Sequence, residues 1–201
     1  MTFLKTSIIS LLLLVGFTEE NGVQVGDKAI DFNLKNIDGS MVTLNSKADV
    51  KGYILVFTCN TCPYSVMYED RIIELDKMYA SKGYPVLAIQ PNNVVKSPGD
   101  SFELMQQRAK DKGFTFPYLM DESQETTATY GATNTPHVFV LDKQADKSFE
   151  VAYIGAIDNN SRNAAAADKH YVQDALNELL AGEPVSDTKT KAIGCTIKWA
   201  N

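Results

Sequence analysis

Two cysteines, Cys59 and Cys62, stand in the sequence CNTC at the point where an apolar run gives way to a charged stretch. Residues 53–58 are rich in β-forming residues and predict a buried strand, and the pattern from Pro63 to Lys82 predicts a helix. Pro63 suits the first turn of that helix, so Cys62 falls near its N-cap. Because free N–H groups and the helix dipole stabilise an anion there, we expect a lowered thiol pKa for Cys62.

Two cysteines at this spacing, at a strand-to-helix junction, are typical of thiol–disulfide exchange. One thiolate attacks a disulfide, its neighbour resolves the mixed disulfide, and the small ring opens and closes with little rearrangement. Two other interpretations stay open, namely buried thiols that fill space and half of a metal site. The two histidines, His137 and His170, stand alone and outside any recognised ligand spacing, so we expect neither a metal nor a cofactor.

Two later features are candidates for the same chemistry. Thr135 and Pro136 stand immediately before the strand-like sequence HVFVLD, and proline is tolerated there because the first residue of a strand needs no ladder hydrogen bond. Cys195, in GCTIKW, is either a second resolving thiol reached across the fold or a buried residue that anchors the tail, and we prefer the second interpretation.

The composition describes a chain with one well-buried core. The 201 residues are 44% hydrophobic, which suits a single domain. A net charge of −6 and a pI of about 4.9 exclude a broad positive surface, so we expect no binding to nucleic acid or to anionic lipid. Three cysteines are too few for a disulfide-dense scaffold.

Residues 1–22 read as a signal peptide or N-terminal hydrophobic segment. A lysine precedes an apolar run from Ile8 to Phe17, which is shorter than the about 20 residues that span a bilayer. No Ala-x-Ala cleavage signal follows. We expect export to the periplasm or another extracytoplasmic compartment, where disulfides persist, with this segment either removed or kept as a tether. No membrane insertion is expected beyond it.

The rest of the chain alternates strand and helix patterns, which predicts an α/β fold with a partly parallel central sheet and helices on both faces. A capping-box spacing, Asp100 to Glu103, predicts the start of the second helix. The expected elements are a hairpin over 31–44, strands in YPVLAIQPNN and FTFPYLMD, helices over 102–112, 123–130 and 168–181, and a second hairpin formed by HVFVLD and EVAYIG.

The sequence resembles the thioredoxin-fold superfamily in its peroxiredoxin-like branch, which is related to alkyl hydroperoxide reductases, to thiol-specific antioxidant proteins and to thioredoxin-like proteins of cytochrome c maturation. The resemblance extends from Val25 to Trp199 through VGDKAIDFNL, FTCNTCPYS, YEDRIIELDKMY, DSFELMQQRAKDKGFTFPYLMDESQ, YGATNTPHVFVLD, YIGAIDNN and GCTIKW. It implies a thioredoxin-like α/β fold, with a central mixed β-sheet flanked by helices on both faces, an N-terminal β-hairpin and a βα insertion. It also implies a cis-proline loop at Thr135 and Pro136 that faces the cysteines and receives an extended substrate strand.

The order of the two cysteines is where the sequence departs from this pattern. Cys59 takes the place of the threonine that normally stands three residues before a peroxidatic cysteine, while Cys62 keeps the following proline. Aligning the preceding strand with that of thioredoxins places Cys62 where the attacking cysteine stands. We therefore predict that Cys62 attacks and Cys59 resolves. Tyr64, Arg108 and Arg162 are candidates for tuning the thiolate if the fold brings them close.

Three functions follow from this resemblance. The leading one is a thiol–disulfide oxidoreductase that uses a Cys59/Cys62 dithiol–disulfide couple on protein or small thiol substrates and is served by an electron-donor redox protein. The alternatives are a thiol peroxidase with Cys62 as peroxidatic cysteine, and a non-catalytic thioredoxin-fold binding protein with a static disulfide. The expected domain spans 23–184, with 185–201 as a tail packed on it, in a monomer or homodimer.

Overall fold

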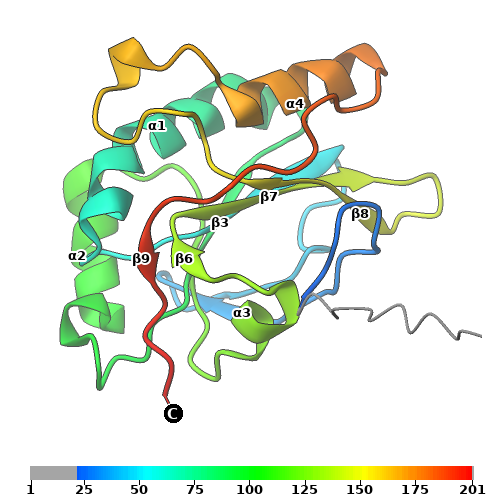
Figure 1. Ribbon diagram of the computed structural model, residues 1–201. Coiled ribbons are helices and arrows are strands. Elements are labelled where there is room, and N and C mark those ends of the chain that lie inside the picture. The colour runs from blue at the N-terminus through cyan, green and yellow to red at the C-terminus, as the bar shows by residue number, and fades with distance from the viewer. Residues whose placement is uncertain (1–21, 201) are drawn as a thin grey trace, which may run out of the picture.

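A seven-stranded mixed sheet forms the centre of the computed structural model, which describes residues 22–200 (Figure 1). Its strand order is β2-β1-β5-β4-β3-β7-β8. The pairs β3–β4 and β4–β5 are parallel, and the other neighbours are antiparallel. The strands are β1 Leu34–Asn36, β2 Met41–Val42, β3 Gly52–Phe57, β4 Val86–Gln90, β5 Tyr118–Met120, β7 His137–Lys143 and β8 Phe149–Gly155. The predicted mixed sheet and both predicted hairpins are confirmed.

Helices cover both faces of the sheet, as predicted. Alternate residues of the central strands enter two apolar cores, because successive side chains of a strand point to opposite faces. Ile54 and Val56 of β3 join the core that includes α1 and α4, whereas Leu55 and Phe57 join the core that includes α3. Figure 1 shows α1 and α4 on one side of the sheet and α3 on the other. The helices are α1 Pro63–Tyr79, α2 Phe102–Lys112, α3 Glu125–Tyr130 and α4 Tyr171–Ala181.

The second helix begins differently from the prediction. Its N-cap is Ser101, whose side chain accepts a hydrogen bond from the backbone N–H of Leu104. Asp100 belongs instead to a short 3₁₀ turn, η2 Pro98–Asp100, and its side chain is fully buried. The capping box predicted at Asp100 and Glu103 is therefore wrong, because the aspartate is held by partners outside the helix.

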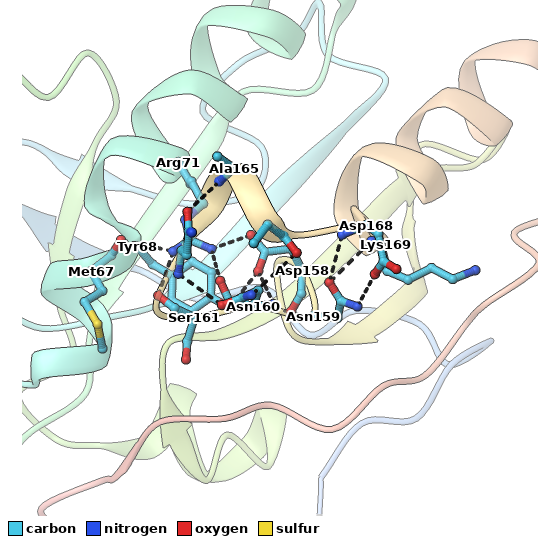
Figure 2. Close-up of polar contacts among 12 residues, drawn as sticks. Met67, Tyr68, Arg71, Asp158, Asn159, Asn160, Ser161, Ala165, Asp168 and Lys169 are labelled. Atoms are coloured by element: carbon cyan, nitrogen blue, oxygen red, sulfur yellow. Dashed lines mark hydrogen bonds and ion pairs between the residues drawn. The ribbon is translucent and has the colours of Figure 1, made fainter.

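A charged clamp joins α1 to the loop between β8 and α4 (Figure 2). Arg71 forms a 2.5 Å ion pair with the buried carboxylate of Asp158 and donates to the backbone carbonyls of Asn160 and Ser161. The hydroxyl of Tyr68 donates to Asp158, and the Arg71 guanidinium lies over the Tyr68 ring. The same loop contains a 3₁₀ turn, η3 Ala164–Ala166. Another 3₁₀ turn, η1 Ala80–Lys82, extends α1 to Gly83, whose φ of 103° ends it.

From the end of α4 the C-terminal tail runs back across the molecule to Asn134 and Thr135 (Figure 1). It first bonds to β8, where the N–H groups of Ile154 and Thr190 donate to the carbonyls of Thr188 and Ile154 respectively. It then forms β9, Cys195–Thr196, which pairs with β6, Asn134–Thr135, and Figure 1 shows the two side by side. This two-stranded sheet is not among the predicted elements.

The predicted signal segment lies, apart from Gly22, outside the described residues. Within 22–200, no helix has both the length and the apolar character needed to cross a membrane. The same part of the chain contains no group of three or more histidine, cysteine, aspartate or glutamate side chains suited to a metal ion.

Candidate active site

Cys62 stands at the N-terminus of α1, as predicted. It is the N-cap residue, with extended backbone angles, and Pro63 follows in the first turn. Its side chain is buried, at 4% exposure, and its sulfur forms a disulfide with Cys195, 133 residues further along the chain, across a Cα–Cα distance of 5.9 Å. The helix N-terminus therefore carries a sulfur that takes part in disulfide chemistry.

Cys59 is a free thiol in the turn that leaves β3. It is 3% exposed, and its sulfur lies 3.3 Å from the Thr135 hydroxyl and 4.0 Å from that of Ser65. The disulfide present is thus Cys62–Cys195 and not the expected Cys59–Cys62 bond. Cys195 is half-buried. Its disulfide with Cys62 ties the tail to the site and brings the third cysteine of the chain into it.

Thr135 contacts both cysteines of the CNTC sequence. Its hydroxyl meets Cys59, and its carbonyl oxygen lies 3.1 Å from the sulfur of Cys62. The second approach is a contact in the disulfide form, since a bonded sulfur has no hydrogen to donate. The peptide bond from Thr135 to Pro136 is cis, as the resemblance implied. The structure therefore brings together Cys59, Cys62, Thr135 and Pro136.

The backbone edge expected to receive a substrate strand is occupied by the tail. In the antiparallel β6–β9 pair, Thr135 lies opposite Cys195 and Asn134 opposite Thr196. The Asn134 side chain also donates a 3.0 Å hydrogen bond to the carbonyl of Gly194. A segment of this chain thus holds the place that the resemblance assigned to a partner.

Asp100 fixes the turn between the two cysteines, and sequence reasoning missed this role. Its carboxylate accepts hydrogen bonds from the backbone N–H groups of Asn60 and Thr61, at 2.8 and 3.0 Å, and from the Thr61 hydroxyl at 2.9 Å. Ser97 and Asn92 donate to the same carboxylate. Five donors thus converge on one fully buried side chain, and this network holds the turn in place.

A small hollow lies beside Cys59. Glu69, Phe114 and Tyr118 are among its lining residues. The Tyr118 hydroxyl donates to the side-chain oxygen of Asn60, and burial raises the pKa of Tyr118, with the negative charge of a Cys59 thiolate as the next cause. The tyrosine therefore remains a neutral hydrogen-bond donor in the wall of this hollow.

The three residues expected to tune the thiolate, Arg108, Tyr64 and Arg162, lie in different parts of the structure. Arg108 binds both carboxylate oxygens of Glu69, at 2.6 and 2.7 Å, and these hydrogen bonds raise the pKa of the arginine. Arg108 therefore affects the hollow beside Cys59 indirectly, through its ion pair with Glu69, which is one of the lining residues. Tyr64 is half-buried in the first turn of α1, and Arg162 is exposed in the loop after β8.

The two histidines are far from equivalent. His137 follows the cis proline, is buried, and packs against the Phe139 ring. Burial, and after it the positive charge of Lys189 in the tail, lower the pKa of His137 to about 4. It is therefore neutral at pH 7. His170, at the start of α4, is half-buried.

Comparison with known proteins agrees with this geometry. The curated protein "Thiol-disulfide oxidoreductase ResA" of Geobacillus thermodenitrificans is 30% identical over 149 residues, which cover 68% of this chain and 79% of that protein. A solved structure of an uncharacterized conserved protein from Geobacillus kaustophilus is 34% identical with a TM-score of 0.79, and the match covers 88% of this chain and 92% of the other.

The fold is shared more widely. A solved structure titled as a thiol:disulfide interchange protein DsbE from Chlorobium tepidum matches with a TM-score of 0.60 at 21% identity, over 79% of this chain and 99% of the other. The model of the AhpC/TSA family, part of the thioredoxin-like superfamily, matches residues 25–146, from the segment before β1 to the turn between β7 and β8. This chain therefore belongs to the AhpC/TSA family.

Proposed function

We propose that the protein exchanges electrons with the disulfides of protein substrates, that Cys62 is the attacking thiolate, and that the substrate docks as an extended strand at Thr135 and Pro136. The reaction class, thiol–disulfide oxidoreduction, is supported by the relatives named for it. The observation that carries the proposal is the position of Cys62. It is the N-cap of α1, it forms a disulfide, and it lies beside the residue that precedes the cis proline.

The first step is attack by Cys62. Free N–H groups and the dipole of α1 stabilise its thiolate relative to the thiol, so a nucleophilic sulfur forms at neutral pH. The thiolate attacks one sulfur of the substrate disulfide, forms a mixed disulfide with it, and displaces the other sulfur as a thiolate that takes a proton from water.

The second step releases the substrate. We assign it to Cys59, because its sulfur and that of Cys62 contact the same residue, Thr135. The Cys59 thiolate attacks the sulfur of Cys62, the bond to the substrate breaks, and the substrate leaves as a thiol. The enzyme has then gained a Cys59–Cys62 disulfide and given two electrons to the substrate. An electron-donor redox protein restores the dithiol.

Peroxide reduction through Cys62 is the second candidate. The AhpC/TSA family match and the Cys62-Pro63 sequence favour it. In that reaction the Cys62 thiolate is oxidised to a sulfenic acid, and a second thiol condenses with it to a disulfide and water. The presence of Cys59 in the usual threonine position argues against peroxide as the main substrate.

Measured turnover separates these functions from each other and from a static disulfide. We expect the wild-type protein to reduce insulin disulfides in the presence of a dithiol, and we expect Cys62→Ser to abolish the reaction. Consumption of hydrogen peroxide without insulin reduction would select the peroxidase, and inactivity toward both would select the binding protein. The reduction potential then gives the direction, since about −270 mV suits a reductant and about −120 mV an oxidant.

The cellular setting follows from the same chemistry. We infer that the protein is exported and works in the periplasm or another extracytoplasmic compartment, as a monomer or homodimer. The hydrophobic segment at residues 8–17 supports export, because its length and its preceding lysine match a secretory signal. Detection of the protein in the extracytoplasmic fraction, and its loss when residues 1–22 are deleted, tests this inference.

A further inference from the structure

The tail around Cys195 has the geometry of a bound substrate. We use the word groove for the edge of β6 at Asn134 and Thr135, beside Cys62. A substrate strand in this groove would pair with β6 and place its cysteine beside Cys62, and β9 does both through Cys195. The bond from Cys62 to Cys195, with Cys59 left as a free thiol, corresponds to the mixed-disulfide stage of the reaction. The tail is therefore arranged as the enzyme would arrange a partner chain.

We propose that residues 194–197 are an internal substrate strand, and that the groove at Thr135 selects extended chains in which glycine precedes the reactive cysteine and an apolar residue follows two positions later. This inference rests on the proposed function and adds the substrate class to it. Two positions of the tail, Gly194 and Ile197, carry the argument.

Gly194 lies where any side chain would collide with the groove. A Cβ atom at this position would overlap the carbonyl oxygen and carbon of Thr135, and it would also come close to the Pro136 nitrogen. These are backbone atoms, so they cannot move aside as a flexible side chain would. The groove therefore admits glycine best at the position before the cysteine.

Ile197 supplies the apolar anchor. Its side chain is 5% exposed and belongs to the same buried cluster as Tyr130, Ala132 and Phe139. Its backbone N–H donates to the carbonyl of Thr133 at 3.2 Å, which continues the strand pairing beyond β9. Thr196, between the cysteine and this anchor, is exposed. The groove thus contacts alternate side chains of the strand, as strand addition requires.

The tail and an external strand exclude one another, because both need the edge of β6. Release of the tail requires no added reactant. When the Cys59 thiolate attacks the sulfur of Cys62, a Cys59–Cys62 bond forms, the Cys62–Cys195 bond breaks, and Cys195 leaves as a thiolate with no net change in electrons.

The tail is also hydrogen-bonded at Lys198, whose N–H donates to Asn92 and whose carbonyl accepts from Asn93 and Gln124, so it returns readily when no substrate is present.

Peptides with the tail sequence test this selectivity. The protein is the full chain with Cys59→Ser and Cys195→Ser, which leaves Cys62 as the single thiol. The probe is the peptide AIGCTIK, residues 192–198, with its cysteine in a disulfide with thionitrobenzoate. Attack by Cys62 forms the peptide–enzyme disulfide and releases coloured thionitrobenzoate. Matched peptides carry Gly194→Val, Ile197→Asp or, as the control at the exposed position, Thr196→Asp.

We expect Gly194→Val and Ile197→Asp to slow the reaction by about tenfold or more, and Thr196→Asp to leave it within about twofold. A second protein variant that adds Gly194→Val to its own tail should react faster with the unchanged peptide, since its tail no longer fits. Trp199, the single tryptophan, reports the tail's departure as a change in fluorescence when the peptide binds.

Equal rates for all four peptides would overturn the inference and leave the proposed function intact, provided that the wild-type protein reduces insulin. Failure of the wild-type protein to reduce any disulfide, together with a clear preference among the peptides, would overturn the proposed function and leave the selectivity of the groove standing. The two ideas therefore fail separately.

Discussion

Cys195 lies directly opposite Thr135 in the β6–β9 pair, and Thr135 is also the residue that contacts Cys59 and Cys62. Thr135 therefore interacts with all three cysteines of the chain. Its hydroxyl contacts Cys59, its carbonyl oxygen contacts Cys62, and its backbone pairs with that of Cys195. This arrangement separates two roles that a C-x-x-C pair alone would combine. In the proposed reaction, a partner strand reaches Cys62 along the edge of β6, and the buried Cys59 resolves the mixed disulfide.

Trapping experiments should identify Cys62 as the attacking thiol. In a Cys195→Ser background, Cys59→Ser should accumulate a mixed disulfide with a protein substrate, because Cys62 can attack and nothing resolves the product. The complexes can be counted by non-reducing electrophoresis and located by peptide mapping.

The matched variant is Cys62→Ser in the same background, which should trap little or no substrate. If Cys62→Ser traps the substrate and Cys59→Ser does not, then Cys59 attacks first and the assignment of roles is reversed.

Asp100→Asn should loosen the turn between the cysteines. The amide keeps one oxygen for the N–H groups of Asn60 and Thr61, which both donate to Oδ1. It loses the negative charge and the second oxygen, which accepts from the hydroxyls of Thr61 and Ser97 and from the Asn92 amide. We expect the free energy of unfolding to fall by about 2–4 kcal/mol. We also expect slower trapping of substrate by Cys62, measured in the Cys59→Ser, Cys195→Ser background.

Asp111→Asn is the control, since Asp111 is exposed and accepts from Gln107 on the same helix. Its effect should stay within about 0.5 kcal/mol. Equal stability and equal trapping rates for the two variants would show that Asp100 does not hold the turn.

The contrast between Cys62 and Asp100 shows which parts of the site can be predicted from sequence. Cys62 was placed correctly because its position depends on local signals, namely an apolar strand before it and a proline after it. The same kind of local pattern located most of the helices and strands. Asp100 was misplaced because its spacing to Glu103 imitates a helix cap, whereas the N–H groups that it holds in the turn, those of Thr61 and Asn60, lie 39 and 40 residues away.

A second thiol reached across the fold was one interpretation of Cys195, but its disulfide with Cys62 could not be predicted, for a similar reason. The two residues are 133 positions apart, and β9 has only two residues, too short for any periodic pattern to show. The cis peptide before Pro136 was anticipated only through the family resemblance. Which strand occupies the edge beside it depends on the path of the tail, which no local propensity encodes.

Acid should destabilise the protein partly through His137. Its pKa is about 4 in the folded protein and about 6.5 when unfolded, so between these values the unfolded chain binds a proton that the folded chain does not. The free energy of unfolding should therefore fall as the pH drops from about 6.5 toward 4, by up to about 3 kcal/mol from this residue.

Denaturant titrations of wild type and His137→Gln at a series of pH values measure this contribution. The variant should lose that part of the pH dependence, whereas His170→Gln, at the half-buried start of α4, should keep it. An unchanged slope in His137→Gln would mean that His137 is not held neutral by burial.

Arg71→Met should destabilise the fold without altering the chemistry of Cys62. The substitution keeps the apolar stem but removes the guanidinium that pairs with Asp158, and a buried carboxylate without its cation is costly (Figure 2). Tyr68 still donates to Asp158, so we expect the free energy of unfolding to fall by about 3 kcal/mol, at the lower end of the range for a broken buried pair.

The control is Lys77→Met, at an exposed position of the same helix, which should change the free energy of unfolding by less than about 0.5 kcal/mol. Because Arg71 lies two turns beyond the N-terminus of α1, the rate at which Cys62 traps substrate should be the same in both variants. A slowed trapping rate in Arg71→Met alone would show that the clamp also positions the reactive end of the helix.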